Sequence, residues 1–276
     1  MSDREIASQD YQLFRNYLEK QCGIVLGDNK QYLVRSRLSP LLRKFQIDSL
    51  AQLIAKVVNS HDRTLREAVI DAMTTNETLW FRDTYPFELL KSQLFAKFKG
   101  KSSPLKIWSA ACSSGQEPYS IAMTALEYQQ RNPGAFPGGV QIVGTDISVD
   151  MLNRCKAAEY DNLSLSRGLS EDRKRQFFEP TANGTLKLKS QVTSMVSFKP
   201  INLLDSYASM GRFDLVFCRN VLIYFSPASK AKILQQIAAS LQNEGVLFLG
   251  ASESMSGLSD AFSMVRCSPG LYYVKK

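Results

Sequence analysis

Residues 105–122, LKIWSAACSSGQEPYSIA, carry the clearest structural signal in the chain. The segment opens with a short apolar run that is typical of a buried strand, and it then passes through small residues into a helical pattern with Pro118 near its start. A strand, a small-residue turn and a helix in this order are typical of the first unit of a parallel α/β sheet. Small residues also allow a ligand to approach the N–H groups of the turn, so we expect a ligand site there.

The same alternation continues downstream. We expect further buried strands at 140–145, 195–201, 213–218 and 246–251, and helices near 118–131, 148–157 and 227–242. The last helix is expected to be capped by Ser226 and to stop before Gly245, and the final 15 residues predict two strands that turn at Pro269-Gly270. The pattern predicts a mostly parallel sheet covered on both faces and finished by an antiparallel hairpin.

Two regions do not follow this alternation. Between the second and third strands, Asn183-Gly184 separates two extended segments, which predicts a small antiparallel β subdomain inserted at about 160–195. Upstream, apolar residues recur at helical spacing before Gly23 and after the expected caps Asp48 and Asp62. We therefore predict an all-α domain over residues 1–85 and an α/β domain over residues 86–276, with GKSSP (100–104) as the best linker.

The composition excludes several classes of protein. Hydrophobic residues make up 44% and charged residues 22%, which is ordinary globular usage and excludes collagen-like and disordered chains. No apolar run is long enough for a membrane helix and MSDREIASQD lacks the apolar core of a secretory signal, so we expect a soluble cytoplasmic protein that is not membrane-inserted.

The inventory of reactive residues narrows the chemistry. The five cysteines form no CxxC pair and His61 is the only histidine, so neither a disulfide framework nor a metal site is expected. The net charge of +8 favours anionic partners, and nucleic acid, anionic lipid and acidic protein surfaces all stay open on this ground.

Polar residues follow several predicted strands, where open α/β sheets bind their ligands. Gly115 is the only glycine in the first turn and no lysine follows it, which favours a nucleoside without phosphates over a dinucleotide. Asp146 could accept hydrogen bonds from a ribose diol, and a helix cap is the alternative. Asn202-Leu203 could contact a purine and Arg219-Asn220-Val221 would lie near the reacting centre, with turn chemistry as the alternative for both segments.

Five ordered motifs then suggest a family: TTNETLWFR (74–82), IWSAACSSGQEPYSIA (107–122), GTDIS (144–148), INLL (201–204) and FCRNVLIYF (217–225). Through them the chain resembles the CheR proteins, the chemotaxis receptor methyltransferases. Members transfer a methyl group from S-adenosylmethionine to glutamate side chains of methyl-accepting chemotaxis receptors, leaving glutamate methyl esters and S-adenosylhomocysteine. The resemblance covers essentially the whole chain and implies a Rossmann-like methyltransferase sheet with an inserted β subdomain behind an all-α domain.

The resemblance also implies roles for individual residues. It implies a cofactor site formed by Asn76, Thr78, Arg82, Glu117, Asp146, Asn202, Leu203, Asn220 and Val221. It places Arg82 and Tyr224 near the transferred methyl group as the catalytic pair, without a metal. In some members the inserted subdomain docks a pentapeptide from the receptor's C-terminus.

The segment around the second helix is basic, with Lys30, Arg35, Arg37, Arg43 and Lys44 and no acidic residue between positions 30 and 44. We expect these residues to bind Glu-rich receptor helices beside the site, and an ordinary solvated face is the alternative. The expected protein is a monomer that is recruited to membrane-bound receptor arrays.

Two rival functions compete with this one. A nucleic-acid methyltransferase would suit the sequence pI of about 9.2, but such enzymes favour an Asn-Pro-Pro-aromatic loop after the fourth strand, where this chain has Asn220 to Tyr224 without proline. A non-catalytic module that binds the cofactor or receptor would not require both Arg82 and Tyr224. We therefore expect no nucleic-acid partner and an active enzyme.

Overall fold

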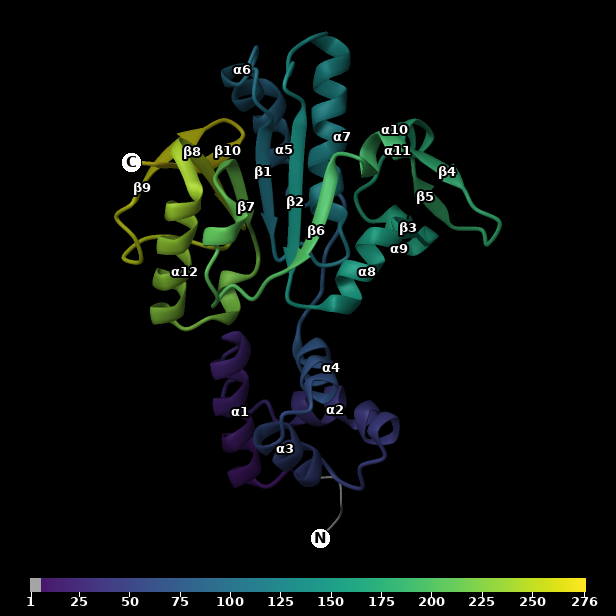
Figure 1. The fold of residues 1–276 in the computed structure, drawn as a ribbon, viewed down its shortest axis with the longest axis vertical. Helices are drawn as coiled ribbons and strands as arrows, with labels where there is room; N and C mark the ends of the chain where they lie inside the picture. Colours follow the sequence, from purple (N-terminus) through teal and green to yellow (C-terminus); the bar gives the residue numbers. More distant parts are fainter. Residues whose placement is uncertain (1–5) are drawn as a thin grey trace.

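The computed structural model describes residues 6–276, so residues 1–5 of the predicted all-α domain lie outside the described residues. A helical bundle is followed by an α/β domain, and the bundle lies beyond one end of the sheet (Figure 1). The bundle consists of α1 (Ser8–Cys22), α2 (Gln31–Phe45), α3 (Leu50–Asn59) and α4 (Arg63–Met73). These helices share an apolar core of their own that extends from Tyr11 to Met73.

Local sequence explains the helix ends in the bundle. Gly23 ends α1 in the left-handed conformation, with φ of 77°, and its N–H donates to the carbonyl of Glu19. Asp62 caps α4 as predicted, by accepting a hydrogen bond from the N–H of Leu65. The prediction that Asp48 caps α3 is wrong, because the hydroxyl of the adjacent Ser49 accepts from the N–H of Gln52 instead.

After the bundle, the chain forms a helical segment and then the first half of the sheet. The elements are α5 (Tyr85–Leu89), the π-helical turn η1 (Leu90–Leu94), α6 (Phe95–Lys97), β1 (Leu105–Ala110), α7 (Gln116–Arg131), β2 (Val140–Asp146), α8 (Val149–Ala157) and β6 (Val196–Pro200). GKSSP, predicted as the best linker, joins α6 to β1, and both of these elements contribute to one apolar core. The predicted boundary between residues 85 and 86 stays a prediction.

The second half of the sheet follows β6. Its elements are the 3₁₀ turn η2 (Ala208–Met210), β7 (Phe213–Cys218), the 3₁₀ turn η3 (Leu222–Tyr224), α12 (Pro227–Ser240), β8 (Leu241–Leu249), β9 (Phe262–Cys267) and β10 (Gly270–Lys275). Ser226 caps α12 as predicted, but the expected extension of this helix to residue 242 is wrong. Leu241 is instead the first residue of β8, which pairs it with Phe213 of β7.

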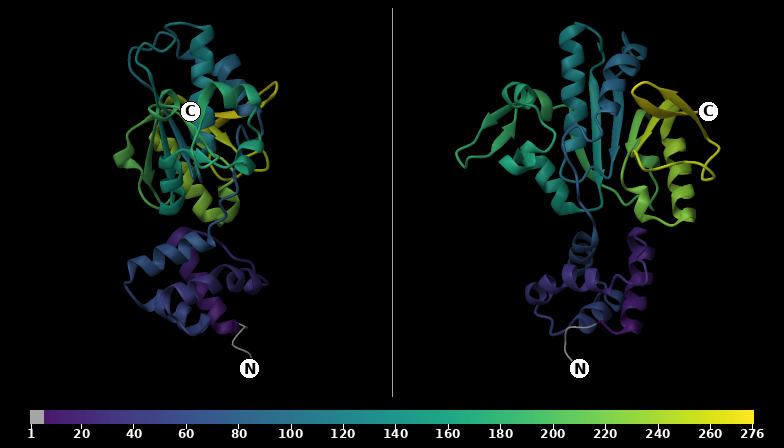
Figure 2. Two further views of the ribbon diagram at one scale, coloured as in Figure 1. Left: turned by 90° about the vertical axis from the view of Figure 1, so that its right-hand side faces the viewer. Right: turned by 180° about the vertical axis from the view of Figure 1, so that it is seen from behind.

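Within residues 6–276 the strands of the central sheet run in the order β6-β2-β1-β7-β8-β10-β9. The strands from β6 to β8 are parallel, and β10 and β9 are antiparallel to their neighbours, which confirms the predicted fold class. Because β1 connects to β2 on one side while β7 lies on its other side, the topological switch point lies at the carboxyl end of β1. That end of the strands faces the bundle (Figures 1 and 2).

Alternating side chains bury both faces of the sheet. In β1, Ile107 joins the core shared with α5 and α7, whereas Trp108 joins the core shared with α12. In β7, Phe217 and Val216 alternate in the same way. The near-continuous apolar runs of these strands are therefore explained by helices on both sides.

The inserted β subdomain is confirmed. It contains β3 (Glu159–Tyr160), α9 (Asn162–Ser166), α10 (Glu171–Phe177), β4 (Phe178–Pro180), β5 (Leu186–Leu188) and α11 (Ser190–Thr193), with a small antiparallel sheet in the order β3-β5-β4. Asn183 and Gly184 lie in the connection between β4 and β5, where Gly184 has a φ of 75°. Among the described residues, no helix is both long and apolar enough to cross a membrane.

Candidate functional site

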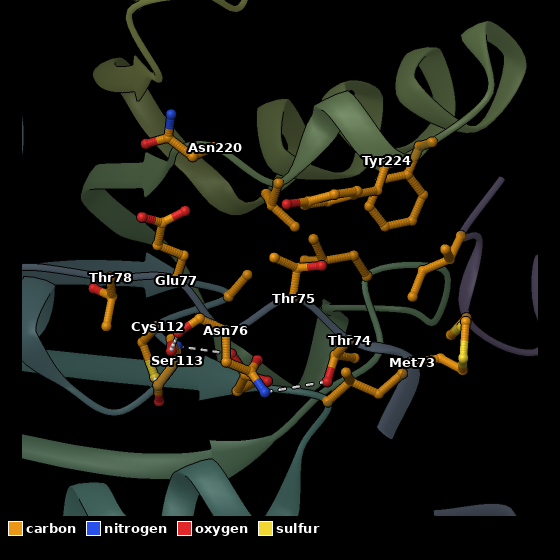
Figure 3. A pocket seen from close by; sticks show the side chains of 18 of the residues that line it. Met73, Thr74, Thr75, Asn76, Glu77, Thr78, Cys112, Ser113, Asn220 and Tyr224 are labelled. Atoms are coloured by element: carbon orange, nitrogen blue, oxygen red, sulfur yellow. Dashed lines mark hydrogen bonds between the residues drawn. The ribbon is translucent and has the colours of Figure 1, made fainter. Parts of the chain in front are cut away.

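A cavity of about 270 Å³ lies between the helical bundle and the carboxyl ends of β1, β2, β6 and β7 (Figure 3). Its walls come from the connection between α1 and α2, from residues 73–79, and from the loops that follow these strands. The volume is close to the lower end of the roughly 300–1,000 Å³ that small-molecule sites usually enclose.

The structure brings the predicted site residues together at this cavity. Its lining includes all nine predicted cofactor residues and Tyr224: Asn76, Thr78, Arg82, Glu117, Asp146, Asn202, Leu203, Asn220, Val221 and Tyr224. Only two of the five basic residues that were predicted to bind the substrate lie at the cavity. Lys30 and Arg37 line it, whereas Arg35, Arg43 and Lys44 do not. His61 is also absent from the lining. The roles of these residues stay predictions at this point.

The turn after β1 is fixed by its neighbours on both sides. Gly115 opens α7 with a φ of 96°, and a Cβ at this position would lie 3.0 Å from the hydroxyl of Tyr160 and 3.1 Å from the Sγ of Cys155. The N–H of Ser113 donates to Asp146 at 2.8 Å, and its hydroxyl donates to the carbonyl of Asn76 at 3.0 Å. The turn therefore joins β2 to the TTNETLWFR segment.

Asp146 combines the two alternatives that its sequence position left open. Its Oδ1 accepts from the N–H of Ser148 at 2.9 Å in a local turn, while Oδ2 accepts from Ser113. Burial raises the pKa of Asp146, and the neighbouring backbone N–H groups of Ser148, Ser113 and Ile147 oppose this rise. Because a carboxylate has about four acceptor positions, two accepted bonds leave capacity for a ribose diol.

Glu117 belongs to a buried charge network that includes Arg219. It accepts from the hydroxyl of Ser109 at 2.7 Å and from Nη1 of Arg219 at 2.9 Å. Arg219 was expected near the reacting centre together with Asn220 and Val221, and it lines the same cavity, but no separate role was predicted for it. A lone arginine after a strand gives no sign in the sequence of which carboxylates it will meet.

The loop after β7 is held by Glu253, which sequence reasoning missed. Oε2 of Glu253 accepts from the N–H groups of Asn220 and Gly250, both at 2.7 Å, and Oε1 accepts from those of Val221 at 3.1 Å and Ile223 at 3.3 Å. Asn220 itself has a φ of 56°, a conformation that asparagine tolerates better than most residues. One carboxylate thereby fixes the loop that carries Asn220 and Val221.

The end of α1 closes one side of the cavity through backbone contacts. Nδ2 of Asn202 donates to the carbonyl of Gln21 at 2.7 Å, and the N–H of Val25 donates to the carbonyl of Tyr224 at 2.9 Å. The side chain of Tyr224 lies across the cavity from Asn76 and Ser113 (Figure 3). The role of Gln21 and Val25 was not predicted, because backbone groups leave no mark in a sequence.

Residues 73–82 form the rim between the two domains. Arg37 holds the start of this segment, with Nη1 donating to the carbonyls of Met73 at 2.5 Å and Thr74 at 3.1 Å and Nη2 donating to the hydroxyl of Thr75 at 2.9 Å. Further along, Nη1 of Arg82 donates to the carbonyl of Glu77 at 3.1 Å. Arg37, predicted to bind substrate, therefore makes internal contacts that shape this rim.

The chemistry of the lining fits S-adenosylmethionine. Asp146 offers a buried carboxylate with acceptor capacity for ribose hydroxyls, and the side chains of Leu203 and Val221 offer an apolar wall for a purine. Arg82 and Glu117 place opposite charges on one cavity, which suits the zwitterionic methionyl end.

Comparison with known proteins agrees with this geometry. Residues 76–271 match the family described as "CheR methyltransferase, SAM binding domain", and residues 9–74 match "CheR methyltransferase, all-alpha domain". The chain is 60% identical over 271 residues to the chemotaxis protein methyltransferase of Vibrio parahaemolyticus, and the match covers 98% of each chain. It is 32% identical over 248 residues to that of Escherichia coli, covering 89% of this chain and 84% of the other. The protein therefore belongs to the CheR family and is an S-adenosylmethionine-dependent chemotaxis methyltransferase.

Proposed function

We propose that the protein methylates glutamate side chains of bacterial chemoreceptors and leaves them as methyl esters. The observation that carries this proposal is the composition of one cavity, where Arg82 and Tyr224 share the lining with Asp146 while His61 lies elsewhere. A glutamate carboxylate has an unperturbed pKa of about 4.3, so near neutral pH it is already an anion and needs no general base. A site without histidine suits such a nucleophile.

The side chains at the cavity would then orient the reactants and keep water away. The bound cofactor supplies a methyl group on a positively charged sulfur. The planar guanidinium of Arg82 can hold a carboxylate of the cofactor or of the substrate, and the Tyr224 hydroxyl can donate one hydrogen bond without removing the nucleophile's charge. Orientation of this kind can contribute roughly 7 kcal/mol or more to lowering a barrier.

The acceptor would approach along the basic side of the bundle. Lys30 reaches the cavity lining, while Arg35, Arg43 and Lys44 are exposed on α2 outside it. Glu-rich receptor helices would be attracted to these cations, which raises the association rate in a salt-dependent way. Arg37 would mainly hold the rim formed by residues 73–82, because its guanidinium already makes three internal hydrogen bonds.

The inserted β subdomain would serve as a second attachment point. Its small antiparallel sheet ends in the strands β3 and β4, and an extended receptor peptide could add a strand at such an edge. We propose that the enzyme acts as a monomer at receptor arrays. Titration of a receptor C-terminal pentapeptide, with sedimentation of the same sample, would test the docking and the oligomeric state together.

The primary test is Arg82→Ala assayed with labelled methyl donor and receptor-containing membranes. We expect the wild-type protein to incorporate label that base releases as methanol, and Arg82→Ala to lose methyl transfer by roughly 100-fold or more, because orientation is lost. Label recovered in nucleic acid would instead support the rival reaction. Unchanged transfer by Arg82→Ala would remove Arg82 from the site.

A second test addresses Asp146. In calorimetry with S-adenosylhomocysteine, Asp146→Ala should bind at least about tenfold more weakly, because hydrogen bonds to a charged group contribute roughly 1.5–3 kcal/mol. Equal affinity would assign Asp146 to the turn alone.

The basic surface is tested by the double variant Arg43→Glu and Lys44→Glu, since neither residue lines the cavity. Methylation of receptors should slow several-fold at low salt while affinity for S-adenosylhomocysteine stays unchanged. A rate that does not respond to salt or to the double variant would leave α2 as a plain solvated face.

A further inference from the structure

The turn that carries Arg82 has an unusual backbone. Phe81, Asp83 and Thr84 have φ values of 49°, 64° and 53°, so three non-glycine residues around Arg82 have the positive φ that favours glycine. Bulky residues rarely adopt this conformation, and it persists where surrounding contacts enforce it. The sequence alone does not explain why the chain should accept it here.

Arg219 supplies contacts that enforce this turn. Its side chain is only 1% exposed, and Nη2 donates to the carbonyl of Arg82 at 2.8 Å and to Oδ2 of Asp83 at 2.7 Å. On its other side Nη1 donates to Glu117 at 2.9 Å, so one guanidinium connects the turn to a residue of the cavity wall. Two carboxylates thus flank one buried cation, and Asp83 does not line the cavity.

We propose that Arg219 is a positioning residue for methyl transfer: it ties the left-handed turn around Arg82 to Glu117 and thereby holds the Arg82 side chain at the cavity. The planar fork of arginine matches this task, because it reaches acceptors in two directions at once, which the single ammonium group of lysine cannot do. The inference rests on the proposed role of Arg82 in methyl transfer.

The substitution Asp83→Asn tests the ion pair between Asp83 and Arg219. Asparagine has almost the same shape as aspartate and tolerates the left-handed conformation, so the substitution removes the charge that faces Arg219 without a backbone penalty. We expect kcat with receptor-containing membranes to fall roughly 10- to 100-fold, the order expected when a reacting group is misplaced by about 1 Å. Affinity for S-adenosylhomocysteine should fall less than kcat does, because Glu117 keeps its bond to Arg219.

Arg219→Lys extends the test. It keeps the charge and loses the fork, so kcat and cofactor affinity should both fall. When Asp83→Asn is added to Arg219→Lys, kcat should change by less than about twofold, because the bidentate contact of Arg219 with the turn is already lost. Independent, multiplicative effects of the two substitutions would contradict the proposal.

Lys101→Met is the matched control for a generic loss of stability. Lys101 pairs with the largely buried Asp214 at 2.6 Å, at the amino end of the strands and away from the cavity. We expect a lower melting temperature with an unchanged kcat. The proposal fails if Asp83→Asn retains full kcat, or if Lys101→Met reduces kcat as much at a similar loss of melting temperature. Unchanged transfer by Arg82→Ala would instead remove Arg82 from the site, and label recovered in nucleic acid rather than in receptors would defeat the proposed function itself.

Discussion

On the sheet side of the cavity, two carboxylates fasten the turns after β1, β2 and β7, whereas on the bundle side the closing contacts are made by backbone groups. Asp146 and Glu253 together accept six backbone hydrogen bonds from the turns around them. At the bundle, Val25 and Gln21 contact the sheet domain through a backbone N–H and a backbone carbonyl. The two walls therefore differ in how strongly single side chains determine their shape.

The two walls would hold the cofactor in different ways. A loop whose donors are already satisfied by a fixed carboxylate keeps its shape without a ligand, which makes the sheet wall preorganised. The bundle wall depends on the packing of a few residues at its edge, among them Gly23 against Phe225. We expect changes in the sheet wall to reduce stability and binding together, and changes in the bundle wall to act mainly on retention of the cofactor.

The largest effect is expected for Glu253→Ala. The substitution removes the acceptor for four N–H groups, and each buried donor left without a partner costs about 1–3 kcal/mol, reduced here because Glu253 is half-buried. The free energy of unfolding should fall by about 3 kcal/mol in urea titration. Affinity for S-adenosylhomocysteine should fall as well, because Asn220 and Val221 lose their support.

Glu253→Gln is the control for this prediction. Glutamine retains one acceptor oxygen, so it should recover part of the stability and part of the affinity. If both variants match wild type in urea titration and calorimetry, the loop is held by something other than this carboxylate, and the contrast between the walls is lost.

Gly23→Ala tests the bundle wall. A Cβ on Gly23 would lie 2.4 Å from a ring atom of Phe225, and the residue has a φ of 77°. The unfavourable backbone conformation and the overpacking should together lower the free energy of unfolding by about 2 kcal/mol. We also expect S-adenosylhomocysteine to dissociate faster in stopped-flow measurements.

Gly134→Ala separates the two causes. Gly134 has a φ of 75°, but a Cβ on this residue would meet no other atom within 4 Å, so only the backbone penalty applies. Its unfolding free energy should fall by about 1 kcal/mol with unchanged dissociation of the cofactor product. Identical behaviour of the two alanine variants would mean that the Phe225 contact does not shape the cavity.

Arg37→Met probes the rim between the walls. Loss of the bonds to residues 73–75 should lower stability by about 1 kcal/mol and weaken binding of S-adenosylhomocysteine by several-fold, since Asn76 and Thr78 follow directly. Arg43→Met on the same helix should leave that affinity unchanged. Equal affinities for the two variants would return Arg37 to the substrate-binding surface.

Much of the fold could be predicted because local signals and apolar patterns agreed. Ser226 before Pro227 marked the start of α12 correctly, since a side-chain cap acts within its own turn. The error at Leu241 has a physical reason: this residue is fully buried as the first residue of β8 and would have been buried in a helix too, so hydrophobicity alone does not distinguish the two.

The site was predictable where it depends on strand ends and on the family's motifs. Asp146 ends one parallel strand and Asn202 follows another, and the carboxyl ends of these strands meet at one edge. The roles of Glu253 and Arg219 were not predicted because the site residues that they hold lie 30 or more positions away in the sequence. Arg37 was placed on the correct helix, but charge patterning could not show that its guanidinium is used internally.

The smallest expected effect is a pH dependence at Asp71, on the face of α4 that contacts α8. Burial raises the pKa of Asp71, and the charges of Asp150 and Glu67 add to the rise, while a hydrogen bond with Ser148 and the charge of Lys44 oppose it. The carboxyl group of Asp71 therefore holds its proton more tightly in the folded state than in the unfolded chain, where an aspartate titrates near about 3.9. As the pH rises from about 4 towards the higher pKa of the folded state, Asp71 ionises more readily in the unfolded chain, and the free energy of unfolding falls. Asparagine does not ionise, and Asp71→Asn should therefore gain stability over wild type between about pH 4 and pH 7, by less than about 1 kcal/mol. Asp161→Asn is the matched control of opposite sign, because hydrogen bonds from Ser164 lower the pKa of Asp161. Urea titrations across this pH range in which Asp71→Asn loses stability, as Asp161→Asn is expected to do, would show that the junction of α4 and α8 carries no charge penalty at Asp71.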